Sequence, residues 1–194
     1  MTENEPLPRR SPQYTAEDRW PGDPDREELV ARTIRVDHAG EYGAIRIYDG
    51  QLAVLGRSAE AATIRKMAEQ EQRHLKAFER LMVERRVRPT LLHPLWHVAG
   101  FALGAATALL GPRAAMACTV AVEEVIDAHY ARQAEALGED EAALRETVEE
   151  FRADEATHRE IGLEHGAEAA PAYPLLAGAI KTASRLAIWL STRI

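Results

Sequence analysis

Two short motifs in this chain combine residue types that bind transition metals. Glu71 and His74 stand three positions apart, and Glu155 and His158 repeat that spacing later in the chain. Residues three apart share one face of a helix, so each pair can offer a carboxylate oxygen and an imidazole nitrogen to the same ion. This ligand chemistry suits iron, and by ligand type alone it leaves manganese open.

Each motif has a lone glutamate upstream, and together they form a repeated arrangement. Glu41 precedes Glu71 by 30 residues, and Glu123 precedes Glu155 by 32. A tyrosine and a glutamine also follow each lone glutamate at the same distances. We infer an internal duplication. The repeated residues are Tyr48 and Gln51 in the first copy and Tyr130 and Gln133 in the second.

The spacing predicts two antiparallel helical hairpins, because residues equidistant from a turn lie at the same height. The midpoint between the two glutamates is Gly56 in the first copy and Glu139, beside Gly138, in the second. Glycine is the residue expected just past the end of a helix. Each hairpin is therefore expected to place its lone glutamate level with its own Glu-x-x-His motif.

Apolar residues at alternating steps of three and four predict four helices, over about 25–55, 59–86, 114–137 and 139–165. The candidate ligands all occupy positions of the buried seam. Unpaired buried carboxylates cost many kcal/mol, whereas four carboxylates balance two divalent ions with one imidazole on each. The alternative is a polar network without metal. The six candidates are Glu41, Glu71, His74, Glu123, Glu155 and His158.

The composition favours a single all-helical domain over residues 25–194, because strand-like alternation is absent and Ala, Leu and charged residues dominate. Residues 1–24 hold half of the prolines and are expected to form a disordered tail. A net charge of -7 argues against nucleic-acid binding. Cys118 is expected to be an inert core thiol. The N-terminus resembles neither a secretory signal nor a transit peptide, which indicates a cytoplasmic setting.

Two further segments are strongly apolar. Between its two terminal arginines, segment 88–113 carries no formal charge. This uncharged stretch is long enough for a membrane span. A single crossing is excluded, because it would place ligands of one site on opposite sides of the membrane. We expect an interfacial segment or a helical hairpin that enters one leaflet.

The C-terminal segment 171–194 repeats this pattern as an amphipathic helix with basic residues and no acidic ones. Basic amphipathic helices bind anionic membrane surfaces, so peripheral membrane association is expected. The alternatives are that both segments pack against the bundle or form a homodimer contact.

Together these motifs closely resemble those of the demethoxyubiquinone hydroxylases of ubiquinone biosynthesis, from about residue 30 to the C-terminus. The stretches that carry the resemblance are Asp-His-Ala-Gly-Glu41-Tyr-Gly-Ala, Glu71-x-x-His74, Ala-Val-Glu123-Glu, Glu155-x-x-His158-x-x-Ile-Gly-Leu and Ala-Pro-Ala-Tyr173.

The resemblance implies a ferritin-like four-helix bundle with a di-iron centre, bound peripherally to the cytoplasmic face of the cell membrane. The implied reaction uses O2 and reducing equivalents to hydroxylate the ring of demethoxyubiquinone or demethoxyubiquinol. By position, the resemblance makes Glu71 and Glu155 the bridging ligands. It assigns Glu41 with His74 to one iron and Glu123 with His158 to the other. A lipid-binding or biosynthetic partner protein is a further expectation.

The resemblance also suggests that His129 and Tyr130 help to deliver electrons. No nucleotide-binding glycine motif occurs, so NADH as the donor would bind without a Rossmann unit or through another protein. As a hypothesis, the segments 88–113 and 171–194 form the entrance for the substrate.

Several residues near the candidate ligands have both a structural and a functional interpretation. Tyr48 and Tyr130 are either core hydroxyls bonded to a carboxylate or a redox relay. Asp154 either orients a ligating imidazole or is a solvated surface residue. His38 shares the seam with Glu41 and is either a core histidine or a site residue, whereas Glu124 is rotated about 100° away from the seam.

Two competing functions use the same features. A ferritin-like iron store or peroxide scavenger would have the same ligands, but it has no need of the two apolar segments. A non-catalytic, membrane-docked helical scaffold would have the segments without the metal.

Overall fold

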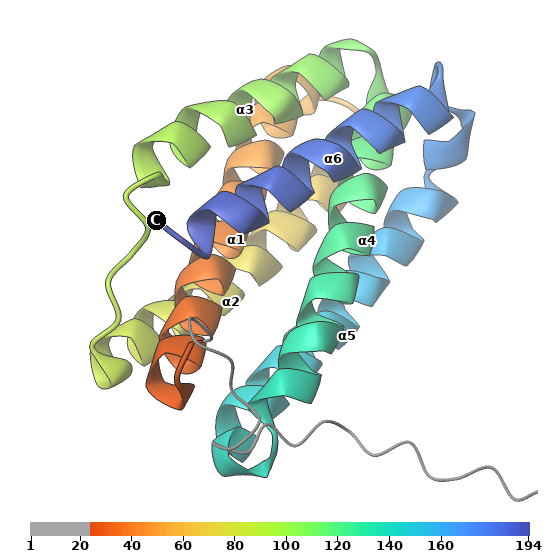
Figure 1. The fold of residues 1–194 in the computed structure, drawn as a ribbon. Coiled ribbons are helices and arrows are strands. Elements are labelled where there is room, and N and C mark those ends of the chain that lie inside the picture. Colours follow the sequence, from red (N-terminus) through yellow and green to blue (C-terminus); the bar gives the residue numbers. More distant parts are fainter. Residues whose placement is uncertain (1–23) are drawn as a thin grey trace, which may run out of the picture.

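The computed structural model describes residues 24–194, and over that range the chain is all-helical. Residues 24–194 form four long helices and two further helices, α3 and α6. In Figure 1, α3 and α6 lie over α1 and α4. The predicted tail 1–24 lies outside the described residues, except for Pro24. The long helices are α1 (Arg26–Leu55), α2 (Ala61–Arg85), α4 (Pro112–Leu137) and α5 (Ala142–Glu164); the others are α3 (His93–Leu109) and α6 (Tyr173–Ser191), with short 3-10 helices η2 (Glu139–Glu141) and η3 (Ala167–Ala169).

The two predicted hairpins are present, and their turns fall where the spacing placed them. Gly56 follows the last residue of α1 as its C-cap, and Gly138 does the same for α4, where its φ of 63° suits glycine. The start of α1 is capped by Asp25, whose side chain accepts a hydrogen bond from the Glu28 amide at 2.8 Å. The second hairpin differs from the prediction at one point, because residues 139–141 form a 3-10 turn and α5 begins only at Ala142.

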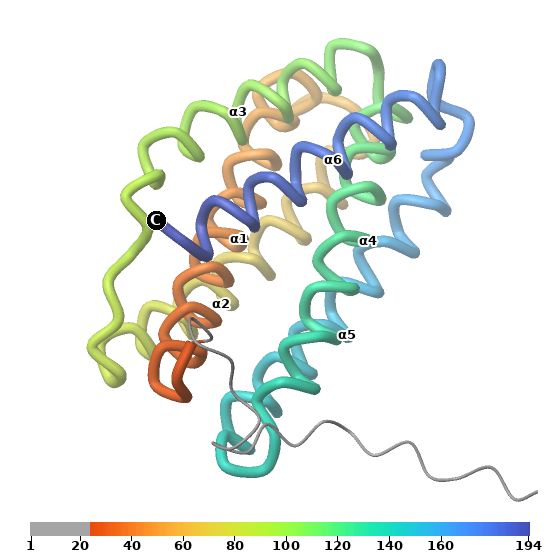
Figure 2. The backbone as a smooth tube through the Cα atoms, in the orientation of Figure 1, coloured from red at the N-terminus to blue at the C-terminus, as the bar shows by residue number. Residues whose placement is uncertain are grey.

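The connection between the two hairpins runs back along the bundle as a stretch without a long helix followed by helix α3, as the tube in Figure 2 shows. The expected alternative of a helical hairpin in this segment is wrong, since residues 93–109 form one helix packed along α1. Glycines allow that packing. A Cβ on Gly104 would lie 1.9 Å from the Ile47 carbonyl oxygen, and one on Gly50 would lie 2.1 Å from the Phe101 carbonyl oxygen, so the two backbones meet directly.

The core has three apolar clusters: one lies between α4 and α6, and the other two belong mainly to the four long helices. Of these two, one includes Tyr48, Met67 and Met116, and the other includes Phe78 and Leu137. By sequence position the candidate ligands fall between these two clusters on all four long helices. The bundle therefore holds a polar layer between two apolar ones.

The outer faces of α3 and α6 leave large apolar side chains in contact with solvent. Val98 is 65% exposed, and Trp189 is 52% exposed. Neither helix could cross a membrane, because no helix among residues 24–194 is both long enough and apolar enough to do so. The other exposed apolar side chains on or beside these helices are Leu91, Leu95, Leu109, Leu110, Leu175 and Leu186.

Candidate metal centre

The structure brings the six predicted ligands together in the middle of the bundle, and all six are buried. They form two groups of four residues, and within each group the potential ligand atoms lie within 4.8 Å of one another. Glu71 and Glu155 belong to both groups. The first group also contains Glu41 and His74, and the second also contains Glu123 and His158.

Both histidines turn the same ring nitrogen, Nδ1, toward the carboxylates. The Nδ1 of His74 lies 3.5 Å from Glu41 Oε2 and 3.4 Å from Glu155 Oε1. The Nδ1 of His158 lies 2.9 Å from Glu71 Oε1 and 3.2 Å from Glu155 Oε2. The Nδ1 of His74 also lies 3.6 Å from Glu71 Oε2, so each imidazole is directed at two or more carboxylates, as a ligand of one shared ion would be.

The opposite nitrogen of each histidine has a polar partner from the other hairpin. His74 Nε2 lies 3.0 Å from Asp154 Oδ2, and His158 Nε2 lies 3.3 Å from Gln70 Oε1. Such contacts fix the orientation of a ligating imidazole. Asp154 therefore takes the orienting position that was one of its two predicted roles. Sequence reasoning missed Gln70, although it directly precedes Glu71 as Asp154 precedes the matching glutamate of the duplicated motif.

The two tyrosines of the duplication bond to carboxylates across the bundle. The Tyr130 hydroxyl donates to Glu41 Oε1, and the Tyr48 hydroxyl donates to Glu123 Oε1 at 3.2 Å. The prediction of core hydroxyls bonded to a carboxylate is confirmed. The carboxylate is that of the other hairpin, because residues seven apart on one helix are two turns apart.

Burial and mutual repulsion perturb the titration of this cluster. Burial raises the pKa of Glu41 and of Glu123 well above the ordinary value, and neighbouring carboxylates raise both further. Burial would also raise the pKa of Glu71, but the nearby imidazoles of His158 and His74 outweigh burial and lower that pKa to about 2. Burial would lower the pKa of His158, but Glu155 and Glu71 raise it to about 9. Without a cation, bound protons must offset the repulsion between these buried carboxylates.

Several ligand atoms fit a cation better than they fit each other. Both oxygens of Glu71 and the Nδ1 of His74 are buried without a hydrogen-bond partner. The Nδ1 of His158, by contrast, has a hydrogen-bond contact with Glu155 Oε2 at 3.2 Å. Buried polar atoms in folded proteins are normally satisfied, so orphaned ligand atoms that converge on one point indicate a metal-binding site.

A second polar group lies beside the ligands, around Asp37. Gln133 Nε2 donates to Asp37 Oδ1 at 2.7 Å, and His129 Nε2 lies 3.6 Å from the same oxygen. Burial raises the pKa of the Asp37 carboxyl, while His129 and Gln133 act against that rise. Sequence reasoning missed Asp37 as a site residue. The available signal was its position four residues before Glu41, which puts both on one helix face.

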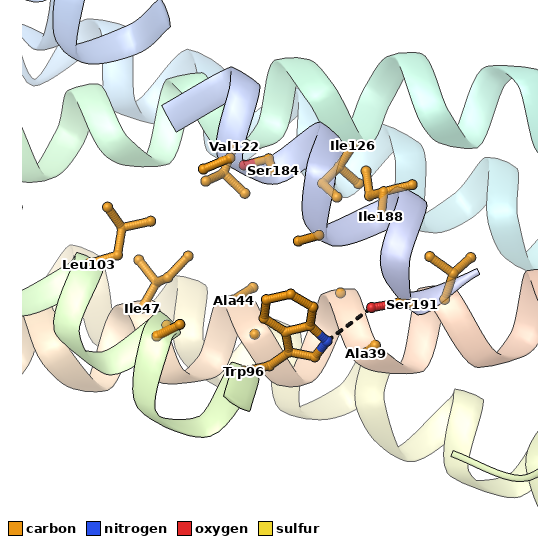
Figure 3. A pocket seen from close by; sticks show the side chains of 17 residues that line it. Ala39, Ala44, Ile47, Trp96, Leu103, Val122, Ile126, Ser184, Ile188 and Ser191 are labelled. Atoms are coloured by element: carbon orange, nitrogen blue, oxygen red, sulfur yellow. Dashed lines mark hydrogen bonds between the residues drawn. The ribbon is translucent and has the colours of Figure 1, made fainter. Parts of the chain in front are cut away.

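An apolar cavity of about 160 Å³ lies between α1, α3, α4 and α6. Figure 3 shows Ile47, Leu103 and Ile126 around it, and Trp96, whose indole N–H donates to Ser191 Oγ at 2.9 Å. A second cavity of about 30 Å³ is lined by four of the candidate ligands, Glu41, Glu71, Glu123 and Glu155. The two cavities share the lining residues Val36, Gly40, Ala44, Val122, Ile126 and Ile188. The two cavities therefore adjoin between the α3–α6 side and the carboxylates, and we call the pair the channel.

Three other residues weighed from the sequence lie outside the ligand groups. Glu124 belongs to neither ligand group, which agrees with its predicted rotation away from the seam. It forms an ion pair with Lys181 of α6. Cys118 is buried, and burial raises the pKa of its thiol to about 12, which agrees with an inert core residue. His38 is buried, and its ring stacks on His93 with 5.8 Å between the ring centroids.

Comparison with known proteins gives a consistent result. The family model described as ubiquinone biosynthesis protein COQ7 matches residues 28–191. A Rhodospirillum rubrum protein named 3-demethoxyubiquinol 3-hydroxylase is 60% identical over 93% of this chain and 85% of its own length. A Homo sapiens protein named NADPH-dependent 3-demethoxyubiquinone 3-hydroxylase, mitochondrial, is 56% identical over 85% of this chain and 78% of its own. A Saccharomyces cerevisiae protein named 5-demethoxyubiquinone hydroxylase, mitochondrial, is 41% identical over 86% of this chain and 78% of its own.

Proposed function

This chain belongs to the family of ubiquinone biosynthesis protein COQ7, and we propose on that premise that its carboxylate cluster is the oxidising centre of a quinone-ring hydroxylase. The protein is an oxidoreductase that hydroxylates the ring of demethoxyubiquinone or demethoxyubiquinol in ubiquinone biosynthesis. One observation carries the proposal for the site: two overlapping groups of buried ligands lie at the inner end of an apolar channel.

Two iron ions are the cofactor that these ligands fit. Glu71 and Glu155 would be shared by both ions, because they alone belong to both ligand groups. The centre would supply activation of O2 when it is loaded with reduced iron. Asp154 holds the ring of His74, and Gln70 holds the ring of His158, so that each Nδ1 points at its ion.

The tyrosines and the apolar walls set the environment of that centre. Tyr48 and Tyr130 hold Glu123 and Glu41 by hydrogen bonds from opposite hairpins. The channel walls are almost entirely apolar, so they exclude water from the oxidising centre and accept the substrate ring. The orientation of the ring is then left to the few polar side chains that line the inner cavity.

The channel opening connects this chemistry to a lipid substrate. Helices α3 and α6 line the outer cavity, through Trp96, Gly100, Ala183 and Ala187 among others, and both expose apolar side chains outward. We place this face on the cytoplasmic surface of the cell membrane, where an isoprenoid tail keeps the substrate in the bilayer. The flanking basic residues Arg88, Arg113, Arg185 and Arg193 suit anionic headgroups.

The electron donor and the oligomeric state belong to the same proposal. Some relatives carry the words NADPH-dependent in their names, so NADH and NADPH are both candidate donors here. Residues 24–194 contain no strand and hence no Rossmann unit, so a nicotinamide would bind directly or act through another protein. His129 and Tyr130 line the inner cavity, and the Tyr130 hydroxyl donates to Glu41, so both lie close enough to the ligands to take part in electron delivery. A homodimer and a lipid-binding partner protein are compatible with the exposed face.

The proposal is tested by loading the full chain with iron anaerobically in detergent and adding reductant, O2 and demethoxyubiquinol. About two irons per chain and a product heavier by one oxygen atom are the expected results. Glu155→Gln should abolish both, and the exposed change Glu150→Gln should abolish neither. Consumption of O2 without hydroxylated ring would instead support a ferritin-like iron-binding or peroxide-scavenging protein.

A further inference from the structure

Asp37 places a buried carboxylate at the wall of the inner cavity, and one of its two oxygens has no partner. The side chain is 0% exposed and lines that cavity together with Glu41 and Glu123. Its Oδ1 accepts the hydrogen bond from Gln133, whereas its Oδ2 has no hydrogen-bond partner among residues 24–194. A buried carboxylate oxygen without a partner is costly, so a group that enters the cavity is expected to bind it.

The surroundings of Asp37 define the kind of group that fits. The Nε2 of His129 lies 3.6 Å from Oδ1 and is itself buried without a hydrogen bond. Burial raises the pKa of Asp37, and the contacts with His129 and Gln133 oppose that rise by stabilising the charged carboxylate. In its ionised form the carboxylate only accepts hydrogen bonds, so its Oδ2 then requires a partner with an O–H or N–H group. A carbonyl oxygen in the same place would be repelled.

The position of Asp37 relative to the ligands matches the dimensions of an aromatic ring. Asp37 and Glu41 are four residues apart on α1, so their side chains are neighbours at about 6 Å on one helix face. The substrate ring has six carbons and carries its two oxygens on opposite carbons. Each of the other four carbons is therefore bonded to a carbon that carries an oxygen. A ring oxygen held at Asp37 therefore leaves an adjacent carbon directed toward the ligand cluster.

Resting on the proposed function, we propose that Asp37 is a substrate-binding residue whose Oδ2 accepts a hydrogen bond from a ring hydroxyl. It thereby makes the enzyme select the reduced, hydroxyl-bearing ring over the quinone. Gln133 holds the carboxylate from its other oxygen, so that Oδ2 stays turned to the cavity. The apolar residues shared by the two cavities, such as Ala44 and Ile188, contact the faces of the ring.

The test compares the binding of two oxidation states of one short-tailed ligand. Iron-loaded full-length protein in detergent, without O2 or reductant, is titrated with the demethoxyquinol and with the demethoxyquinone. The readout is quenching of Trp96, which lines the channel. Wild-type protein should bind the quinol at least about tenfold more tightly, since a hydrogen bond to a buried charge is among the stronger ones. Asp37→Asn should lose that preference and bind the quinone as before.

Two controls separate this effect from misfolding. Asp49→Asn, which removes a partly exposed carboxylate on the same helix, should keep the wild-type preference. In wild-type protein, methylation of both ring hydroxyls should weaken binding about as much as Asp37→Asn does, and this comparison needs no variant to fold.

Three outcomes would overturn the inference. The first is equal affinity of wild-type protein for the quinol and the quinone. The second is a preference for the quinol that survives Asp37→Asn, because the partner of Oδ2 would then be a water molecule. If these results came with normal hydroxylation by the wild-type enzyme, only the role of Asp37 would fail. If wild-type protein bound neither ligand and formed no product, the proposed function would fail as well.

Discussion

The hydroxyl of Tyr130 donates a hydrogen bond to the carboxylate of Glu41, although the two residues belong to different hairpins. The duplicated chain makes the reciprocal bond, from Tyr48 to Glu123. The histidines show the same pattern, because the Nε2 of His74 in the first hairpin contacts Asp154 in the second. Each half of the chain therefore positions the ligands of the other half, and neither hairpin could hold an ordered site alone.

Removal of the Tyr130 hydroxyl should leave Glu41 with an unsatisfied oxygen in a buried site. We expect Tyr130→Phe to lower the free energy of unfolding of the iron-loaded protein by about 1–3 kcal/mol, measured by urea denaturation. Tyr42→Phe is the matched control, because the Tyr42 hydroxyl bonds to His97 at the exposed edge of α1 and α3. Equal losses in the two variants would argue against a special role for the bond to Glu41.

Asp154→Ala should weaken metal binding while the protein stays folded. The variant leaves the His74 ring free to turn, and loss of such an orienting contact typically costs about 10–100-fold in metal affinity. Competition with a chelator measures the change. Glu150→Ala removes an exposed acid from the same helix and should have no effect. An unchanged affinity in Asp154→Ala would mean that the carboxylates alone orient the imidazole.

A bulky side chain in the channel should block the ring without disturbing the metal. Ala187 lines the outer cavity on α6, and Ala187→Phe is expected to reduce kcat/KM for demethoxyubiquinol about tenfold or more. Iron content should stay at the wild-type value. Ala179→Phe adds the same ring to the exposed side of α6 and should leave kcat/KM unchanged. If both variants were fully active, the substrate would have to reach the carboxylates by another path.

The metal-free protein should lose stability as the pH rises from about 6.5 to about 9. The folded-state pKa of His158 is raised to about 9 from 6.5, so its contribution is complete below pH 6.5 and disappears above the folded value. We expect a loss of at least about 1 kcal/mol over this window, measured by urea denaturation with chelator present.

Two comparisons assign that pH dependence to the site. Loading with iron should suppress it, because a metal replaces the proton on the ligating nitrogen. The exposed substitution His165→Gln should preserve it, whereas His158→Gln should reduce it. A metal-free protein whose stability rose with pH in this window would contradict the protonated cluster.

The sequence was sufficient to predict the hairpins and the convergence of the six candidate ligands, because both depend on periodic spacing along single helices. Gly56 and Gly138 marked the turns, and charged residues at apolar seam positions identified the site. Contacts between hairpins were harder to predict. Gln70 and Asp37 lie just beside their seams, and their partners come from helices far away in the chain.

The course of residues 88–113 was beyond prediction for a different reason. Composition alone could not separate a helical hairpin from a single packed helix, because both are apolar and uncharged. What decided it was the direct backbone contact at Gly50 and Gly104, and this depends on how α1 and α3 cross in three dimensions. Helices α3 and α6 pack on the bundle with their inner faces and leave apolar side chains exposed on their outer faces. Packing against the bundle and binding to a membrane, which were weighed as alternatives, are therefore compatible.

The central claim is that two metal ions share Glu71 and Glu155, and iron stoichiometry tests it most directly. We would count iron per chain after anaerobic loading of wild-type protein, Glu71→Gln and the exposed control Glu69→Gln. The account predicts about two irons in wild-type protein and in the control, and almost none in Glu71→Gln, since that carboxylate belongs to both ligand groups. Two irons in Glu71→Gln, or no iron in wild-type protein, would contradict it.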